Sequence, residues 1–247
     1  MEIVAIIPAR YASTRFPGKA LADIKGKPMI EHVYQRVAMV EEINRIIVAT
    51  DDERIYQRVR DFGGEVVMTS PDHQSGTDRI AEVARELECD LVVNVQGDEP
   101  LLFPEMVREA IQPFYQEKDL PMGTLKKKIE DEEELTNPNV VKVVTDNQGN
   151  ALYFSRYPIP YPRNEGADYF KHIGLYVYQR DFLLEYTRLP RTPLEKTESL
   201  EQLRALENGY RIRVVETGYN SIGVDTPEDI IKVREFLERQ ADNVKTG

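Results

Sequence analysis

The sequence predicts an α/β fold, in which a Rossmann-like, mostly parallel, doubly wound sheet carries an α+β insertion. Short apolar runs rich in β-branched residues alternate with amphipathic stretches through the first half of the chain. The chain has 247 residues, enough for one large domain with a sub-domain. Hydrophobic residues make up 41% of the chain and charged residues 30%, which excludes a disordered or fibrous protein.

The first half of the chain yields strands and helices in strict alternation. Strands are expected at residues 3–7, 45–50, 65–68 and 91–95, and helices at residues 29–40, 52–62, 77–87 and 104–114. This βαβ order is typical of parallel strands joined by right-handed crossovers. Ligands of such sheets bind beyond the carboxyl ends of the strands.

The alternation ends near residue 120. A hairpin is expected at 140–145 and 151–155, followed by a strand at 169–178, a helix at 197–207, a strand at 211–216 and a closing helix at 227–239. Three prolines within residues 157–162 exclude a central strand there. We therefore predict a mostly parallel core of residues 1–120 and 210–247, with an insertion of residues 121–209.

Charge and composition exclude several classes of protein. The net charge of −11, with no basic stripe, argues against nucleic acid or an anionic membrane as a partner. No apolar run approaches the roughly 20 residues of a membrane-spanning helix. The single cysteine, Cys89, excludes a disulfide framework and a cysteine-built metal cage. The N-terminus lacks a signal peptide, so we expect a soluble cytoplasmic protein.

A cationic segment follows the first predicted strand. Residues 10–27 hold five basic side chains against one acid: Arg10, Arg15, Lys19, Lys25 and Lys27 against Asp23. The segment matches neither the P-loop nor the dinucleotide-binding glycine pattern, which disfavours a P-loop NTPase and a classical dinucleotide-binding enzyme. Arginine and lysine at the end of a first strand suit a small anionic ligand such as a triphosphate. The alternative is a solvated loop that is basic by chance.

Two aspartates are candidate metal ligands. Asp98 follows the clearest strand and should emerge at its carboxyl end, where a carboxylate can hold Mg²⁺ beside substrate phosphates. It could instead be a turn-forming residue. Asp225 could be the cap of the last helix. However, Thr226, Pro227 and Asp229 already supply a cap, a first-turn proline and an acid, which leaves Asp225 outside the helix.

Seven motifs, in order, carry a family resemblance. They are R-x-x-S-T-R-x-P-G-K at 10–19, HQSGTDR at 73–79, VNVQGDEP at 93–100, NPNVVKVV at 137–144, YFSR at 153–156, HIGLY at 172–176 and GVDTPED at 223–229. Together they resemble the 3-deoxy-manno-octulosonate cytidylyltransferase family of sugar nucleotidyltransferases, over essentially the whole chain.

The resemblance implies that CTP and the sugar acid Kdo are joined into CMP-Kdo with release of pyrophosphate, for lipopolysaccharide biosynthesis. It implies catalysis by Arg10, Lys19, Asp98 and Asp225, with Mg²⁺ bound by Asp98 and Asp225. The implied nucleotide contacts are Arg10, Ser13, Arg15, Lys19, Ser75, Gly76 and Arg79. The implied sugar-acid contacts are Gln96, Arg156, His172, Tyr176, Glu201 and Gln202. The family likeness also implies a homodimer.

Other interpretations remain open from the residues alone. Ser75 and Gly76 suit a helix cap as well as a nucleotide pocket. Arg156 and His172 could be structural residues on strands. The proline-rich stretch at 157–162 is a candidate dimer contact or a surface loop. A cytidylyltransferase for a sialic-acid-like sugar and a non-catalytic nucleotide sensor of the same fold are the competing functions.

Overall fold

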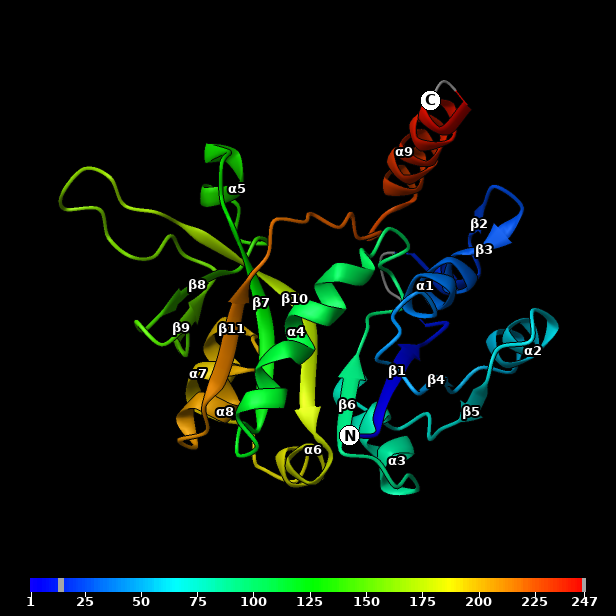
Figure 1. Ribbon diagram of the computed structural model, residues 1–247, viewed down its shortest axis with the longest axis horizontal. Helices are drawn as coiled ribbons and strands as arrows, with labels where there is room; N and C mark the ends of the chain where they lie inside the picture. Colours follow the sequence, from blue (N-terminus) through cyan, green and yellow to red (C-terminus); the bar gives the residue numbers. More distant parts are fainter. Residues whose placement is uncertain (13–15, 246–247) are drawn as a thin grey trace. The chain divides into compact units, whose positions relative to one another are not determined.

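The structure is a computed structural model that describes residues 1–12 and 16–245. The predicted nucleotide contacts Ser13 and Arg15 therefore lie outside the described residues. The chain forms two compact units, each described here by itself (Figure 1). The first comprises Met1–Cys89, Asn94–Pro104 and Ser221–Gly247, and the second comprises Asp90–Val93 and Glu105–Asn220. Besides the predicted insertion of residues 121–209, the second unit contains residues 90–93, 105–120 and 210–220.

Parallel strands organise the first unit. β1 (Ile3–Ala9) pairs with β4 (Arg45–Thr50), and β4 pairs with β5 (Val66–Met68). The helices α1 (Met29–Val37), α2 (Glu53–Asp61) and α3 (Gly76–Arg85) follow the amphipathic stretches. In α2, for example, Ile55 and Val59 lie four residues apart and are fully buried, as one apolar helix face requires. The predicted parallel βαβ order is confirmed.

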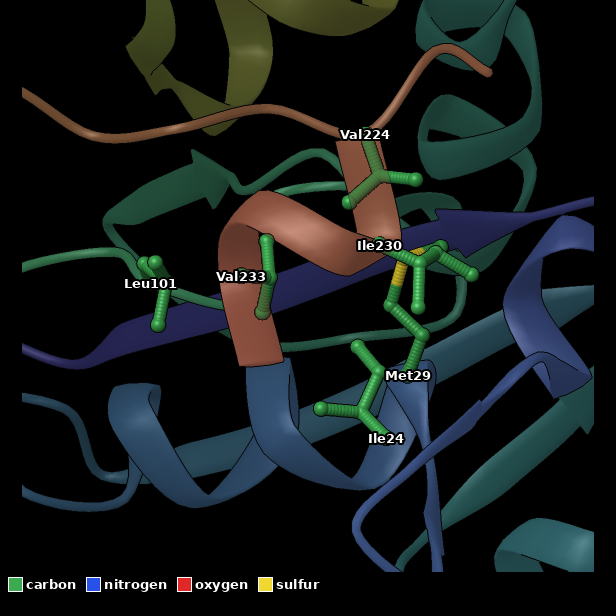
Figure 2. Packing of buried hydrophobic residues seen from close by; sticks show 6 residues of the cluster. All are labelled: Ile24, Met29, Leu101, Val224, Ile230 and Val233. Carbon is green, nitrogen blue, oxygen red and sulfur yellow. The ribbon is translucent and has the colours of Figure 1, made fainter. Parts of the chain in front are cut away.

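An apolar cluster anchors the last helix, α9 (Pro227–Lys245), within the first unit. Figure 2 shows Val224, Ile230 and Val233 meeting Ile24, Met29 and Leu101. Ile24 belongs to the small ribbon of β2 (Asp23–Ile24) and β3 (Lys27–Pro28), and Met29 begins α1. Burial of these six side chains fixes the segment just before α9, which carries Asp225.

The second unit holds a mixed sheet. Its strand order is β11 (Ile212–Glu216), β7 (Met122–Lys128), β10 (Phe170–Gln179) and β6 (Leu91–Asn94), the last of which passes into the first unit at Asn94. β7 is parallel to β11 and antiparallel to β10. β8 (Lys142–Thr145) and β9 (Ala151–Ser155) form the predicted hairpin. α4 (Pro104–Gln116) begins at the border between the two units.

The prediction of one continuous helix at 197–207 is wrong. The structure has α7 (Pro193–Glu198) and α8 (Leu203–Glu207), separated by a turn. Ser199 ends α7 with a left-handed backbone (φ 52°), a conformation that a continuous helix cannot contain. Glu201 and Gln202 therefore lie on a turn and not on the Leu-lined helix that the spacing predicts.

Further elements were not expected from the sequence. They are the ribbon of β2 and β3, η1 (Lys19–Leu21), α5 (Glu132–Thr136), α6 (Arg180–Tyr186) and, most important, β7. In β7, residues 122–125 are buried in succession, so the strand shows no apolar–polar alternation. The α/β fold class is confirmed by the elements of both units. In residues 1–12 and 16–245, no helix combines the length and the apolar character that crossing a membrane requires.

Candidate functional site

A cavity of about 270 Å³ opens in the first unit, beyond the carboxyl ends of its strands. Its lining includes every predicted nucleotide contact in the described part of the chain, together with Gln96 and both predicted metal ligands. These residues are Arg10, Lys19, Ser75, Gly76, Arg79, Gln96, Asp98 and Asp225. Segments separated by more than 200 residues in sequence thus meet around one space.

Lys19 is positioned by a tight reversal of the cationic segment. The N–H of Gly18 donates to the carbonyl oxygen of Tyr11 at 2.9 Å, and Gly18 has a left-handed backbone (φ 72°). A glycine adopts this conformation without strain. A Cβ atom at Gly18 would also approach the Tyr11 ring to 3.0 Å. The reversal starts η1 at Lys19 and leaves this side chain on the cavity wall.

Asp98 lies in the loop that follows β6, where backbones approach closely. A methyl group at Gly97 would stand 2.9 Å from the carbonyl oxygen of Pro8, so glycine is required at this position. The carbonyl of Asp98 accepts a hydrogen bond of 2.9 Å from the N–H of Val224. Because Val224 is buried in the apolar cluster, this bond places the next residue, Asp225, beside Asp98.

The ammonium group of Lys19 joins the two aspartates. Its Nζ lies 2.6 Å from Oδ2 of Asp98 and 3.5 Å from Oδ1 of Asp225. Lys19 is mostly buried, whereas 34% of the Asp98 side chain and 54% of the Asp225 side chain are exposed. Two carboxylates therefore converge on one cation while keeping surface toward solvent.

The cap of α9 is made by other residues, as the spacing predicted. The carboxylate of Asp229 accepts hydrogen bonds from the N–H groups of Asp225 (3.1 Å) and Thr226 (3.0 Å). These bonds and one from Lys232 outweigh the effect of burial and lower the pKa of Asp229 to about 2. The acid that caps the start of α9 is therefore Asp229, whereas the carboxylate of Asp225 lines the cavity and contacts Lys19.

Glu99, to which the sequence analysis assigned no role, is buried next to this pair. Burial, followed by the negative charges of Asp98 and Asp225, raises the pKa of Glu99 to about 7, although a hydrogen bond from Ser221 opposes the rise. Its Oε2 has no hydrogen-bond partner among the described residues. The site therefore has a third carboxyl group beside it. Sequence reasoning missed this group because Asp98 alone accounted for the acidic part of the VNVQGDEP motif.

The HQSGTDR motif builds the start of α3. Ser75 caps this helix, accepting from the N–H of Asp78 at 3.1 Å, and a Cβ atom at Gly76 would come within 3.3 Å of Pro8. Arg79 is 3% exposed and donates to Oδ2 of Asp51 at 2.8 Å and to Thr69. The motif thus lines the cavity, but Arg79 is held by an internal ion pair that the sequence analysis did not anticipate.

The remaining predicted sugar-acid contacts, apart from Gln96, lie in the second unit. Arg156 follows β9, and its guanidinium donates to the carbonyl oxygens of Glu198 (2.7 Å), Pro138 (2.9 Å) and Ser199 (3.3 Å). Arg156 therefore satisfies carbonyl groups at the end of α7. A guanidinium has five N–H donors, so these bonds leave capacity for a further acceptor.

Glu198 completes this link between β9 and α7. Its carboxylate accepts from Oγ of Ser155 at 2.8 Å and from the N–H of Arg156 at 2.9 Å. Arg156 thus donates two hydrogen bonds to Glu198, one from its backbone and one from its guanidinium, and they fix the chain immediately before the turn that carries Glu201 and Gln202. No pattern in the sequence distinguishes Glu198 from the other acids of this region.

His172 and Tyr176 lie on one face of β10, as predicted from their spacing, with ring centroids 5.3 Å apart. In a regular strand, residues four apart are separated by roughly 13 Å. The register of β10 on β7 explains the contact: Ile173 pairs with Leu125 and Tyr176 with Thr124, so β10 carries two extra residues here. Burial lowers the pKa of His172 to about 3 and raises the pKa of Tyr176.

Tyr186 stabilises the turn between α7 and α8, because its hydroxyl donates to the carbonyl oxygen of Glu201 at 2.6 Å. Gln202 is 4% exposed, and its amide nitrogen Nε2 has no hydrogen-bond partner within the described chain. A buried, unsatisfied amide donor is unusual in native proteins. It marks this turn as a place where an external oxygen atom can bind.

The chain is similar to known cytidylyltransferases over nearly its whole length. A family model described as cytidylyltransferase matches residues 4–213. The 3-deoxy-manno-octulosonate cytidylyltransferase of Trichlorobacter lovleyi is 58% identical, covering 97% of this chain and 100% of that protein. The protein of the same name from Solibacter usitatus is 59% identical, covering 96% of this chain and 95% of that protein.

A solved structure supports the same relationship. The CMP:2-keto-3-deoxy-manno-octonic acid synthetase complexed with CTP is 48% identical and superposes with a TM-score of 0.94, covering 97% of this chain and 100% of that chain. The resemblance drawn from the seven motifs is confirmed by these comparisons. They do not test the roles of individual residues, which stay predictions.

Proposed function

This chain belongs to the cytidylyltransferase family, among the 3-deoxy-manno-octulosonate cytidylyltransferases, and from that premise we propose that it joins CTP and Kdo into CMP-Kdo with release of pyrophosphate. The observation that carries the proposal is the convergence of Lys19, Asp98 and Asp225 on one cavity. A hydroxyl oxygen of the sugar acid attacks the α-phosphorus of CTP, the bond to the bridging oxygen breaks, and pyrophosphate leaves.

The protein's contribution to this displacement is alignment and charge compensation. Arg10 and Lys19 supply positive charge on the cavity wall for the triphosphate and for the departing pyrophosphate. Ser75 and Gly76, at the start of α3, offer a close backbone approach for the nucleoside. Arg79 contributes indirectly, because its hydrogen bond to Asp51 stabilises the wall of the cavity.

Mg²⁺ fits the donor set of the cavity. The two carboxylates that meet at Lys19 are hard oxygen ligands, and Mg²⁺ is commonly held by one or two carboxylates plus substrate phosphates. Asp98 and Asp225 would hold the ion, which would supply electrostatic stabilisation of phosphate oxygens and a more acidic attacking hydroxyl.

The sugar acid is proposed to contact Gln96 and the group Arg156, His172, Tyr176, Glu201 and Gln202. This group suits a polyhydroxylated acid. Arg156 keeps guanidinium donors for a carboxylate, and the Nε2 of Gln202 is a buried donor that lacks an acceptor in the described part of the chain. His172 is neutral at physiological pH and so contributes a hydrogen bond without charge.

The direct test is a pyrophosphate-release assay with CTP, Mg²⁺ and Kdo. We expect release that depends on Kdo and stops when EDTA removes divalent ions. Faster release with a nine-carbon sialic acid than with Kdo would replace the proposed substrate. CTP binding without release on any sugar acid would instead indicate a nucleotide sensor, and activity that EDTA leaves unchanged would contradict the metal site.

We further propose that the chain forms a homodimer through the proline-rich stretch at 157–162. Two aromatic side chains of this stretch are largely exposed, Tyr157 at 76% and Tyr161 at 85%. Exposed aromatic residues are typical of protein–protein contacts. Sedimentation should show a dimer for the native protein and a monomer for the Tyr157→Ser, Tyr161→Ser variant. A dimer that survives both substitutions would place the contact elsewhere.

The reaction itself suggests a setting. CMP-Kdo is an activated form of a sugar acid, and we propose that it serves lipopolysaccharide biosynthesis. Because CTP is a cytoplasmic metabolite, we place the enzyme in the cytoplasm.

A further inference from the structure

Thr124 lies on β7 beside the register shift of β10 and makes three hydrogen-bond contacts with residues of β10. Its hydroxyl oxygen Oγ1 lies 2.8 Å from the carbonyl oxygen of Leu175, 3.0 Å from that of Ile173 and 3.0 Å from Nε2 of His172. Thr124 is fully buried on β7 and pairs with Tyr176 across the register shift. One hydroxyl thus contacts Leu175, one of the two inserted residues, the adjoining Ile173 and the ring of a proposed sugar-acid contact.

The proton count at this hydroxyl decides the state of the histidine. A threonine hydroxyl has one proton to donate, and both carbonyl oxygens can only accept. If the hydroxyl donated to His172, two carbonyl oxygens would face its lone pairs at 2.8 and 3.0 Å with no proton between them. The hydroxyl therefore directs its one proton to the side of the two carbonyl oxygens, the nearer of which belongs to Leu175, and accepts from Nε2–H of His172.

We propose that Thr124 is a positioning residue that holds His172 as the Nε2–H tautomer, so that Nδ1 is an acceptor for a hydroxyl group of the sugar acid. The neutral imidazole has one donor and one acceptor nitrogen, and fixing the first fixes the second. The ring is also packed edge-on against Phe154, with centroids 5.1 Å apart, which restricts its flipping.

This assignment has a consequence for specificity, which rests on the function proposed above. An Nδ1 acceptor binds a hydroxyl and repels a carboxylate oxygen, whose lone pairs would face its own. His172 would therefore recognise a hydroxyl group of the substrate, which leaves the carboxylate to a cationic residue such as Arg156. The two extra residues of β10, of which Leu175 contacts Thr124, bring Tyr176 beside the ring.

The test uses the full-length protein and a matched pair of variants, Thr124→Val and Thr124→Ser. Valine keeps the shape of threonine but has no hydroxyl, whereas serine keeps the hydroxyl. The chain has three histidines, so ¹⁵N spectra of histidine-labelled protein resolve their tautomers, and His172→Gln assigns the signals. We expect one tautomer, Nε2–H, for His172 in the wild-type and Thr124→Ser proteins, and both tautomers in Thr124→Val.

Kinetics supply the second readout. Thr124→Val should raise the KM for Kdo about tenfold, the scale of one hydrogen bond, with the KM for CTP unchanged, and Thr124→Ser should restore it to within about twofold. An Nδ1–H tautomer in the wild-type protein, or equal rises of both KM values in Thr124→Val, would overturn the proposal. Should the valine variant not fold, the wild-type tautomer still decides the matter. Absence of turnover with Kdo would refute the proposed function and leave the tautomer assignment standing.

Discussion

Replacing Asp98 by alanine should leave a folded protein whose pyrophosphate release is slower by about 10²-fold or more. Asp98 is one of two carboxylates that converge on Lys19 at the cavity, and it is the closer one, at 2.6 Å. Without it, the proposed metal keeps one protein ligand, Asp225. The expected loss is the scale seen when a preorganised electrostatic contact to the reacting groups is removed. Steady-state assays with saturating CTP, Kdo and Mg²⁺ measure it.

The control for this variant is Asp61→Ala. Asp61 ends α2 in the same unit, its side chain is 64% exposed, and its contact with Arg58 is 3.9 Å long, so we expect unchanged turnover. Thermal unfolding of both variants separates loss of catalysis from loss of structure. If Asp98→Ala turns over at the wild-type rate with saturating Mg²⁺, Asp98 has no part in holding the ion.

The features of the site that could be predicted are those that depend on neighbouring residues in the sequence. The position of Lys19 follows from a basic segment after an apolar strand, and that of Asp98 from an acid at the end of another. The capping pattern at Thr226 and Asp229 correctly identified Asp229 as the acid that accepts from the backbone at the start of α9. Each of these inferences needs only the residues on either side of the one in question.

The unpredicted part depends on residues distant in the chain. The two extra residues of β10 exist only in its register against β7, and β7 itself has no alternating pattern to reveal it. The carbonyl group of Ser199, where α7 ends, accepts a hydrogen bond from Arg156, more than 40 residues earlier in the chain. The spacing of leucines within residues 197–207 instead indicated one unbroken helix. Thr124 and Glu198 were missed because threonine and glutamate are common residues whose roles come from their partners.

Replacing Arg204 by methionine should lower the free energy of unfolding by about 3–5 kcal/mol, the scale of stranding one member of a buried ion pair. Arg204 and Glu195 are buried, at 7% and 3% exposure, and form two parallel bonds of 2.9 and 2.6 Å. Methionine fills the space of the arginine stem but leaves the Glu195 carboxylate without its main partner. Urea unfolding of the purified variant measures the loss.

The pH dependence of this variant follows from the carboxyl group. Burial opposes ionisation of Glu195, but the hydrogen bonds from Arg204 prevail and lower its pKa below the ordinary 4.5. In the wild-type protein, the pair therefore contributes stability above pH 4.5 that is lost as the pH falls through the lowered pKa. In Arg204→Met the pKa of Glu195 should rise, so the deficit relative to wild type should shrink in acid.

Two controls define what the loss means. Arg211→Met removes a 42%-exposed arginine from its contact with Asp119, which is 82% exposed, and should cost at most about 1 kcal/mol. Adding Glu195→Gln to Arg204→Met removes the stranded charge and should recover part of the stability. A double variant less stable than Arg204→Met would show that the Glu195 carboxylate is still stabilised by Arg191, whose Nε lies 3.1 Å away, and by the N–H of Thr192 at 3.2 Å, and is therefore not stranded. Because Tyr186, whose ring lies 5.0 Å from Arg204, supports the Glu201 turn, the KM for Kdo should rise in Arg204→Met and stay unchanged in Arg211→Met.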